Sequence, residues 1–181
     1  SAGYGKRLSS LTLEIPKPMI KINNITLLQN TIDTLFSINC QEIVINTHYK
    51  HDFISDFINK NYNHKKIILS YEKEILDTAG GVKNALPLFN NNKVLITNSD
   101  IFWKKENIID IVKLINNYQS YELCKLLLVS EEKAHGLSKK NGDFFLENKY
   151  VKRWDSTKKK FYYSGLQMLY LNVLKNYSFK K

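Results

Sequence analysis

Short β-branched runs alternate with helical segments along this chain, and this alternation limits the fold more than any other feature. Strand patterns occur over 42–47 (EIVINT), 66–71 (KIILSY) and 93–98 (KVLITN). Buried strands separated by helices are typical of a mainly parallel sheet that is covered on both faces. We therefore expect an α/β fold, in which ligands bind at the carboxyl ends of the strands.

The segments between the strands carry apolar residues at helical spacing. The first predicted helix, over 26–38, places Leu28, Ile32 and Leu35 on one face. Further helices are predicted around 53–58, over 81–86 and over 108–115.

The later part of the chain has a different pattern. Strand-like pieces occur over 125–129, 143–146 and 162–170, joined by polar turns that include Asn141-Gly142. We interpret this part as an antiparallel extension of the sheet, placed to cover a substrate.

Length and composition favour one globular domain. The 181 residues are too few for two comfortable domains, so we expect a single domain over 1–181. No apolar run approaches the roughly 20 residues that span a bilayer, and no membrane association is expected. Cys40 and Cys124 lie far apart without metal-ligand spacing, and the first residues carry no signal-peptide pattern. These features predict a reducing cytoplasm.

The charge favours anionic partners but does not select one. The chain has 27 Lys and Arg against 17 Asp and Glu, a formal charge of +10. The lysines form short clusters rather than a basic stripe interleaved with stacking aromatic residues. We interpret them as a solvated surface and expect no nucleic acid partner.

The start of the chain has residues suited to phosphate. Gly3 and Gly5 allow a tight turn that brings backbone N–H groups against phosphate oxygens, and Lys6 and Arg7 add charge-assisted hydrogen bonds. The proline on each side of Lys17 restricts the backbone, so this ammonium group is offered from a rigid support. The pattern is neither a Walker motif nor a complete G-x-G-x-x-G, and alone it also fits an ordinary surface turn.

In combination, these residues resemble the nucleotidyltransferase family that makes nucleotide sugars. The family signature is A-G-x-G-x-R, then a Leu-Thr pair, then P-K-P. The matching positions are Ala2, Gly3, Gly5, Arg7, Leu11, Thr12, Pro16, Lys17 and Pro18. The resemblance implies a Rossmann-like mixed sheet flanked by helices, the nucleotide-diphospho-sugar transferase fold, with an antiparallel extension over the sugar.

Two further segments match the family in the expected order. Residues 74–81 (EILDTAGG) resemble its nucleotide-recognition loop, which implies nucleotide binding by Thr78, Ala79, Gly80 and Gly81. Residues 94–100 (VLITNSD) resemble its strand that ends in a magnesium-binding aspartate, here Asp100. A hard oxygen ligand at the end of a strand suits Mg²⁺, the expected cofactor.

A fourth match lies near the end of the chain. Residues 161–170 (FYYSGLQMLY) resemble the family's strand in which a glycine lines the sugar pocket, here Gly165. The alternative is a bulge glycine. The TAGG loop and the compact length resemble the branch that includes N-acetylmuramate-1-phosphate uridylyltransferase, with mannose-1-phosphate guanylyltransferases as close relatives.

The resemblance implies transfer of a nucleotidyl group from a nucleoside triphosphate to a sugar 1-phosphate, with UTP slightly favoured over GTP. Arg7 and Lys17 take the catalytic roles, with Arg7 on the β and γ phosphates and Lys17 on the α-phosphate. Ala2, Gly3, Gly5 and Lys6 belong to the implied phosphate loop.

Several positions depart from the family pattern. Ser10 replaces a proline, and 154–157 (WDST) lacks a clear Glu-Lys-Pro. We also expect the chain to be truncated at both ends, without the family's first strand and without the D-x-G-T-like segment that carries a second metal-binding aspartate.

Three functional hypotheses follow. The first is an active nucleotidyltransferase, and the second is a nucleotide-binding remnant without two-metal geometry. The third is a basic RNA-binding protein, whose affinity would depend steeply on salt. Asn46, Thr47 and His48 end a strand on the functional side of the sheet, where they either contact substrate or serve as ordinary polar strand ends.

Overall fold

The computed structural model of this chain describes residue 3, residues 14–135 and residues 141–175. Its strands form three hydrogen-bonded groups. Two of them are pairs: β1 (Lys21–Ile22) with β2 (Ile25–Thr26), and β3 (Ile43–Thr47) with β4 (Ile67–Tyr71). The third is a five-stranded sheet of β5 (Lys93–Thr97), β6 (Cys124–Ser130), β7 (Phe144–Glu147), β8 (Tyr150–Arg153) and β9 (Phe161–Tyr170).

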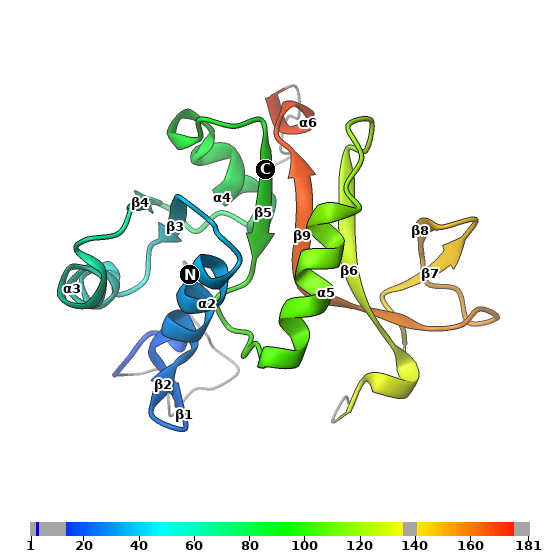
Figure 1. Cartoon of the computed structure of the whole chain (residues 1–181), viewed down its shortest axis with the longest axis horizontal. Coiled ribbons are helices and arrows are strands. Elements are labelled where there is room, and N and C mark those ends of the chain that lie inside the picture. Colours follow the sequence, from blue (N-terminus) through cyan, green and yellow to red (C-terminus); the bar gives the residue numbers. More distant parts are fainter. Residues whose placement is uncertain (1–2, 4–13, 136–140, 176–181) are drawn as a thin grey trace.

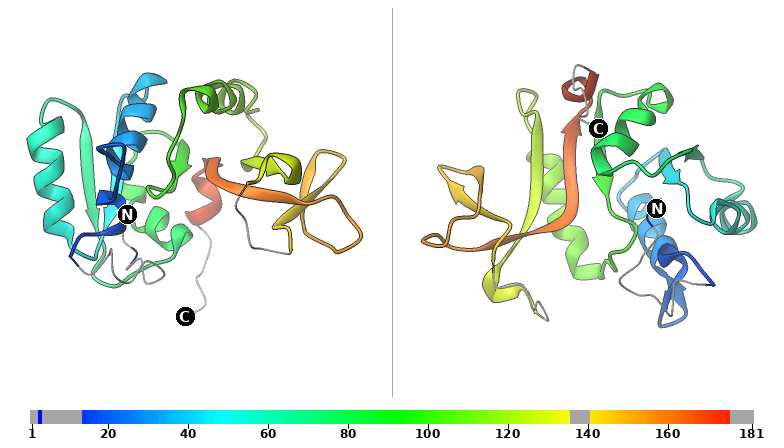
Figure 2. Two further views of the ribbon diagram at one scale, coloured as in Figure 1. Left: turned by 90° about the horizontal axis from the view of Figure 1, so that it is seen from below. Right: turned by 180° about the vertical axis from the view of Figure 1, so that it is seen from behind.

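The helices lie between and around these groups. They are α2 (Leu27–Ser37), α3 (His51–Tyr62), α4 (Thr78–Asn84), α5 (Lys105–Asn116) and α6 (Asn172–Lys175), with 3-10 turns η2 (Lys17–Met19), η3 (Leu86–Leu88) and η4 (Glu131–Lys133). Figure 1 shows β3, β4 and α3 on one side of α2, and β5, β9 and β6 on the other. The views in Figure 2 show the same order, with the β7–β8 hairpin far from β3 and β4.

The expected α/β fold with a mixed sheet is confirmed, but the expectation of a mainly parallel sheet is wrong for the described residues, where most strand pairs are antiparallel. β3 and β4 are parallel, with Ile43 opposite Ile67. β5 instead pairs antiparallel with β9, where Leu95 lies opposite Met168. In the described part of the chain, β3 and β4 are the only parallel pair. An apolar run identifies a buried strand but not its neighbour, and parallel and antiparallel buried strands look alike in sequence.

Two short hairpins were not predicted. Asn23 and Asn24 connect β1 to β2, with φ angles of 49° and 66°. Asn148 and Lys149 connect β7 to β8 in the same way, with φ angles of 49° and 69°. Two-residue turns with positive φ match the twist of antiparallel strands, and asparagine tolerates this conformation better than most residues.

The predicted helix over 81–86 has different ends. α4 begins at Thr78, because the Asp77 side chain caps it by accepting a hydrogen bond from the Gly80 N–H at 2.7 Å. It ends at Asn84, and η3 follows as a separate turn. The glycine pair at 80 and 81 lowers helix propensity and concealed the first turn.

Three apolar clusters hold the elements together. The first joins α2, β3 and α3, the second joins α5 to β9, and the third joins β9 and α6 to α4 and β5. β5 contributes to all three, since Leu95 packs on the first two clusters while Val94 and Ile96 pack on the third. β5 is therefore covered on both faces. No helix in the described residues combines the length and apolar character that crossing a membrane requires.

α5 offers a test of this packing. Ile111 is fully buried against β9, whereas Ile109 on the same helix is 60% exposed. Ile111→Ala should lower the free energy of unfolding by about 2–5 kcal/mol because it leaves a cavity. Ile109→Ala should change it by less than about 0.5 kcal/mol. Urea unfolding followed by circular dichroism measures both, and equal losses would contradict the packing described.

Candidate nucleotide site

A cavity of about 1050 Å³ lies between β3 and β5. Consecutive residues of both strands line it, 43–46 from β3 and 93–97 from β5. Since side chains alternate between the two faces of a strand, consecutive lining residues mean that the strand edges border the cavity. In the described residues β3 pairs only with β4, and β5 pairs only with β9.

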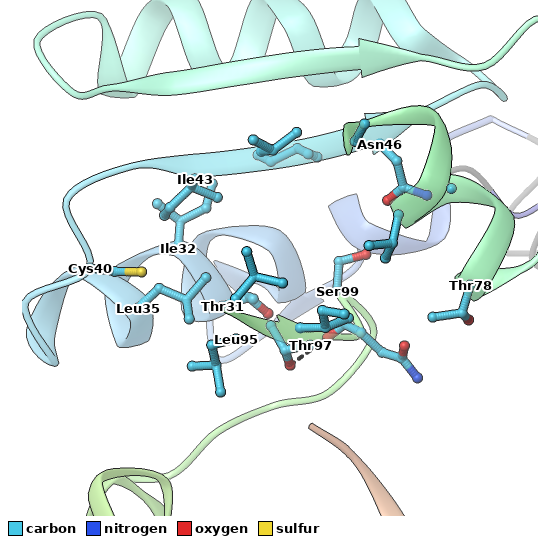
Figure 3. Close-up of a pocket in the computed structure, with 18 of the residues that line it drawn as sticks. Thr31, Ile32, Leu35, Cys40, Ile43, Asn46, Thr78, Leu95, Thr97 and Ser99 are labelled. Carbon is cyan, nitrogen blue, oxygen red and sulfur yellow. Dashed lines mark hydrogen bonds between the residues drawn. The ribbon is translucent and has the colours of Figure 1, made fainter. Parts of the chain in front are cut away.

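The two ends of the cavity are lined by different residues. Figure 3 shows Cys40 near Ile32 and Leu35 of α2 at one end, and Asn46 and Thr78 toward the other. Burial raises the pKa of the Cys40 thiol, as expected in apolar surroundings. Glu42, Lys66 and Lys93 also line the cavity on the Cys40 side, so both ends carry charged residues. The end with Asn46 and Thr78 is the one that Lys17 and Asp100 line, and we call it the polar end.

Lys17 and Asp100 form an ion pair at this polar end. The Lys17 Nζ lies 2.5 Å from Asp100 Oδ2, although the two residues are 83 positions apart in the sequence. Pro16 and Pro18 are both buried, and the Met19 N–H donates to the Pro16 carbonyl at 2.8 Å. The Lys17 backbone is thus held as its flanking prolines predicted.

The loop that carries Asp100 is held by α2. Asn30 makes a two-way contact with the backbone of Trp103, accepting from its N–H at 2.6 Å and donating to its carbonyl at 2.9 Å. The Trp103 ring is buried in the α5 cluster. The segment between β5 and α5 is therefore anchored at Trp103.

The predicted recognition loop lies beside the same end of the cavity. Thr78 and Gly81 are among the lining residues, whereas Ala79 and Gly80 are not. A Cβ atom at Gly80 would lie 2.9 Å from the Leu76 Cβ, so the loop passes too close to this position for a larger residue. Asp77, which caps the helix, also lines the cavity.

Polar residues that sequence reasoning did not assign lie behind this loop. Glu72 is buried and accepts a hydrogen bond from the Asn46 side chain at 2.8 Å. Of the three strand-end residues considered above, Asn46 lines the cavity, Thr47 bonds the His51 ring at 2.8 Å, and His48 bonds the Glu72 carbonyl at 2.7 Å. Strand-end position was the available signal for Asn46. Nothing in the sequence pattern distinguished Glu72 from the exposed Glu74.

Gly165 lies in β9 beside the end of β5. Its φ is +83°, and a Cβ atom there would collide with Ile101 and approach the Asn98 Nδ2 to 3.0 Å. Its carbonyl accepts from the Asn98 N–H at 3.0 Å. Both the positive φ angle and the lack of room for a Cβ atom therefore require glycine at this position. The described residues that line the cavity do not include it, and its role toward a sugar stays a prediction.

The remaining predicted phosphate-loop residues divide into two groups. Gly3 is exposed and lines the cavity. Ala2, Gly5, Lys6 and Arg7 lie outside the described residues. The structure therefore brings Gly3, Lys17, Thr78, Gly81 and Asp100 to one cavity from four separate stretches of sequence.

Comparison with known proteins agrees with this arrangement. A family model described as nucleotidyl transferase matches residues 1–153. The chain belongs to the nucleotidyl transferase family. The matched range includes Lys17, residues 74–81 and Asp100, and it extends through β7 and β8.

Individual relatives within this family use different bases. The chain is 25% identical to D-glycero-alpha-D-manno-heptose 1-phosphate guanylyltransferase from Aneurinibacillus thermoaerophilus, over 88% of this chain and 77% of that protein. It is 28% identical to N-acetylmuramate alpha-1-phosphate uridylyltransferase from Caulobacter vibrioides, over 81% of this chain but only 62% of that protein.

A solved structure shares the fold of this chain. HddC from Yersinia pseudotuberculosis complexed with GMP-PN superposes with a TM-score of 0.75 and 22% identity. The match covers 98% of this chain and 77% of that one. At this identity the likeness concerns the fold alone.

The Asn30 anchor can be tested by substitution. Asn30→Ala would leave the N–H and carbonyl of Trp103 without their partner, so the free energy of unfolding should fall by about 1–3 kcal/mol. Asn61→Ala is the matched control, because Asn61 is exposed and donates one bond along α3. Its expected loss is below about 0.5 kcal/mol. Urea unfolding of both variants measures the two changes. Similar losses of unfolding free energy would mean that Asn30 does not anchor the loop.

Proposed function

We propose that this chain carries the nucleotide end of an active site that transfers a nucleotidyl group to a sugar 1-phosphate. The proposal is carried by one observation: Lys17, Asp100 and the first turn of α4 meet at the polar end of one cavity. A cation, a carboxylate and a glycine-containing loop are the groups that a magnesium–nucleoside triphosphate needs.

In the proposed reaction, a phosphate oxygen of the sugar 1-phosphate attacks the α-phosphorus of the triphosphate. The new oxygen–phosphorus bond forms as the bond between the α-phosphorus and the bridging oxygen breaks, and pyrophosphate leaves with that electron pair. Lys17 holds the α-phosphate and stabilises the charge that develops there. Arg7 and the backbone around Gly3 hold the β and γ phosphates, as the family resemblance implies.

The polar end suits a magnesium ion without being a complete protein cage. No cluster of three or more His, Cys, Asp or Glu side chains that could hold a metal occurs in the described residues. Magnesium in nucleotide sites commonly takes one or two carboxylates and completes its shell with phosphates and water. Asp100 supplies such a carboxylate, and a magnesium ion bound there would neutralise phosphate charge.

The nucleotide base is assigned from residues 78–81 (TAGG), which form the first turn of α4. Relatives with guanylyl and uridylyl activity match at 25% and 28% identity, so similarity does not separate the two bases. The TAGG loop favours UTP in this proposal, with GTP as the alternative. The named relatives act on heptose and N-acetylmuramate 1-phosphates, which supports a sugar 1-phosphate as acceptor.

Pyrophosphate release tests the proposed reaction directly. The protein is incubated with magnesium, UTP or GTP, and a panel of sugar 1-phosphates. Release should require one particular sugar phosphate, and Lys17→Ala should slow it about 10²–10³-fold because the α-phosphate loses its cation. Lys21→Ala, at an exposed lysine of β1, should be unaffected.

Three outcomes can be distinguished. Release that depends on Lys17 and on a sugar phosphate supports the proposal. Magnesium-dependent nucleotide binding by folded protein without any release would identify a binding remnant instead. Binding of RNA that UTP does not displace and that weakens steeply with salt would favour the RNA-binding hypothesis.

Asp100 is tested through metal dependence. In the unaltered protein, magnesium should strengthen triphosphate binding measured by calorimetry. Asp100→Asn removes the carboxylate charge, so most of this strengthening, about tenfold or more, should disappear. Asp110→Asn, an exposed carboxylate on α5, is the control. An unchanged magnesium effect in the Asp100 variant would exclude Asp100 as the metal ligand.

A further inference from the structure

Glu72 follows β4 directly and is almost completely buried, with 1% of its surface exposed. Within the described residues, no lysine, arginine or histidine forms an ion pair with its carboxylate. Burial of an ionised carboxylate is unfavourable unless hydrogen bonds replace its water. The contacts of Glu72 therefore indicate what the carboxylate does.

Both carboxylate oxygens accept a hydrogen bond, each from a different part of the site. Oε1 accepts from the Asn46 side chain at 2.8 Å, and Oε2 accepts from the backbone N–H of Leu76 at 3.0 Å. Asn46 lies in β3, whereas Leu76 lies in the loop between β4 and α4. One side chain thus links the end of a strand to the recognition loop.

The backbone of Glu72 is fixed as well. Its N–H donates to the Thr47 carbonyl at 2.8 Å, and its carbonyl lies 2.7 Å from the His48 Nδ1. Glu72 is therefore tied to the end of β3 through both its main chain and its side chain, so its carboxylate is held in a fixed position.

α4 packs directly on the Glu72–Asn46 pair. A Cβ atom at Gly81 would lie 2.7 Å from Glu72 Oε1 and 2.8 Å from Asn46 Nδ2, so any larger residue there would displace at least one of these two side chains. Gly81, Leu76, Thr78 and Asn46 all line the cavity. The pair thus forms the support behind the cavity wall.

The loop has little packing of its own. Residues 73–78 are exposed, and none of them belongs to the three apolar clusters. A segment with few buried contacts opens easily unless hydrogen bonds hold it. The Glu72 carboxylate supplies a bond at the centre of this loop.

We propose that Glu72 is a positioning residue for the nucleotide, a role that rests on the proposed function. Its carboxylate holds Leu76, Asn46 and the first turn of α4 in the arrangement that receives the base and ribose. Glu72 itself does not touch the ligand, since it lies behind the residues that line the cavity.

The two neighbours explain why a carboxylate is needed. As they lie in the structure, the Leu76 N–H and the Asn46 NH₂ group both donate, so the side chain between them accepts twice. A glutamine has nearly the same shape but only one accepting oxygen, so it satisfies both neighbours only if the Asn46 amide turns over to present its oxygen. Glu72→Gln therefore disturbs the hydrogen bonds with little change in volume. Glu74→Gln, at an exposed position of the same loop, is the matched control.

Hydrogen exchange measures the contact without any ligand. In Glu72→Gln, exchange over residues 73–81 should speed up at least about tenfold, because a charge-assisted bond is lost. Exchange in β5 and α5 should not change, and Glu74→Gln should behave as the unaltered protein. Equal acceleration throughout the chain would show a general stability role and overturn the proposal.

Kinetics measure the consequence for the nucleotide. Glu72→Gln should raise the KM for the triphosphate about tenfold through misplacement of the loop, with kcat and the KM for the sugar phosphate within about twofold. If Glu72 were needed only for stability, the substitution would reduce the fraction of folded protein. The apparent kcat would then fall while the KM stayed unchanged. That result would also overturn the proposal.

A second substitution keeps the test decisive if the first variant folds poorly. In Glu72→Gln with Asn46→Asp, the glutamine NH₂ group can donate to the new carboxylate while its oxygen accepts from Leu76. This double variant should recover the slow hydrogen exchange over residues 73–81, which is measured without any ligand. Failure of this rescue would mean that the hydrogen bonds are not the cause.

The outcomes separate this inference from the proposed function. Pyrophosphate release by the unaltered protein, with an unchanged KM in Glu72→Gln, overturns the role of Glu72 alone. If magnesium with UTP or GTP does not slow hydrogen exchange over residues 73–81 in the unaltered protein, both the proposed function and the role of Glu72 are overturned.

Discussion

The hydrogen bonds between β5 and β9 fix the strand that borders the cavity and leads to Asp100. One edge of β5 pairs with β9 from Lys93 to Thr97, while its other edge borders the cavity opposite β3. Leu95 packs toward α2 and α5, and its two neighbours pack toward α6. A slip of one residue would reverse all these contacts, so the register is strongly specified. Asp100 follows three residues after this strand, and its position depends on that register.

Sequence reasoning predicted the main elements well because their signals are local. The strands at 43–47, 67–71 and 93–97 each differ from the predicted bounds by one residue, since β-branched apolar runs mark buried strands clearly. Pairing is a different matter. That β5 pairs with β9 depends on contacts more than 60 residues apart in sequence, which no local pattern contains. The Asn23-Asn24 and Asn148-Lys149 turns lack the glycine that usually marks such hairpins.

In the candidate site too, some residues were predictable from the sequence and others were not. Residues with their own chemical signature, Lys17 between two prolines and Asp100 after an apolar strand, were identified from sequence, and the structure places them in contact. Asn30 and Glu72 were not identified, because an asparagine within a helix or a glutamate after a strand is ordinary in isolation. Their importance comes from what they face: the backbone of Trp103 for one, and a pair of hydrogen-bond donors for the other. Such roles exist only in the folded chain.

The Lys17–Asp100 pair explains how one site can be stable without a ligand and still open to one. The side chains of the pair are 30% and 36% exposed, so water screens their attraction, and such pairs contribute only about 0–1 kcal/mol. Each residue nevertheless neutralises the other while no ligand is bound. In the proposed complex, a phosphate replaces the carboxylate beside Lys17, and a magnesium ion replaces the ammonium beside Asp100. Separating the pair costs little, and both charges remain neutralised. Nucleotide and metal should therefore bind more tightly together than separately.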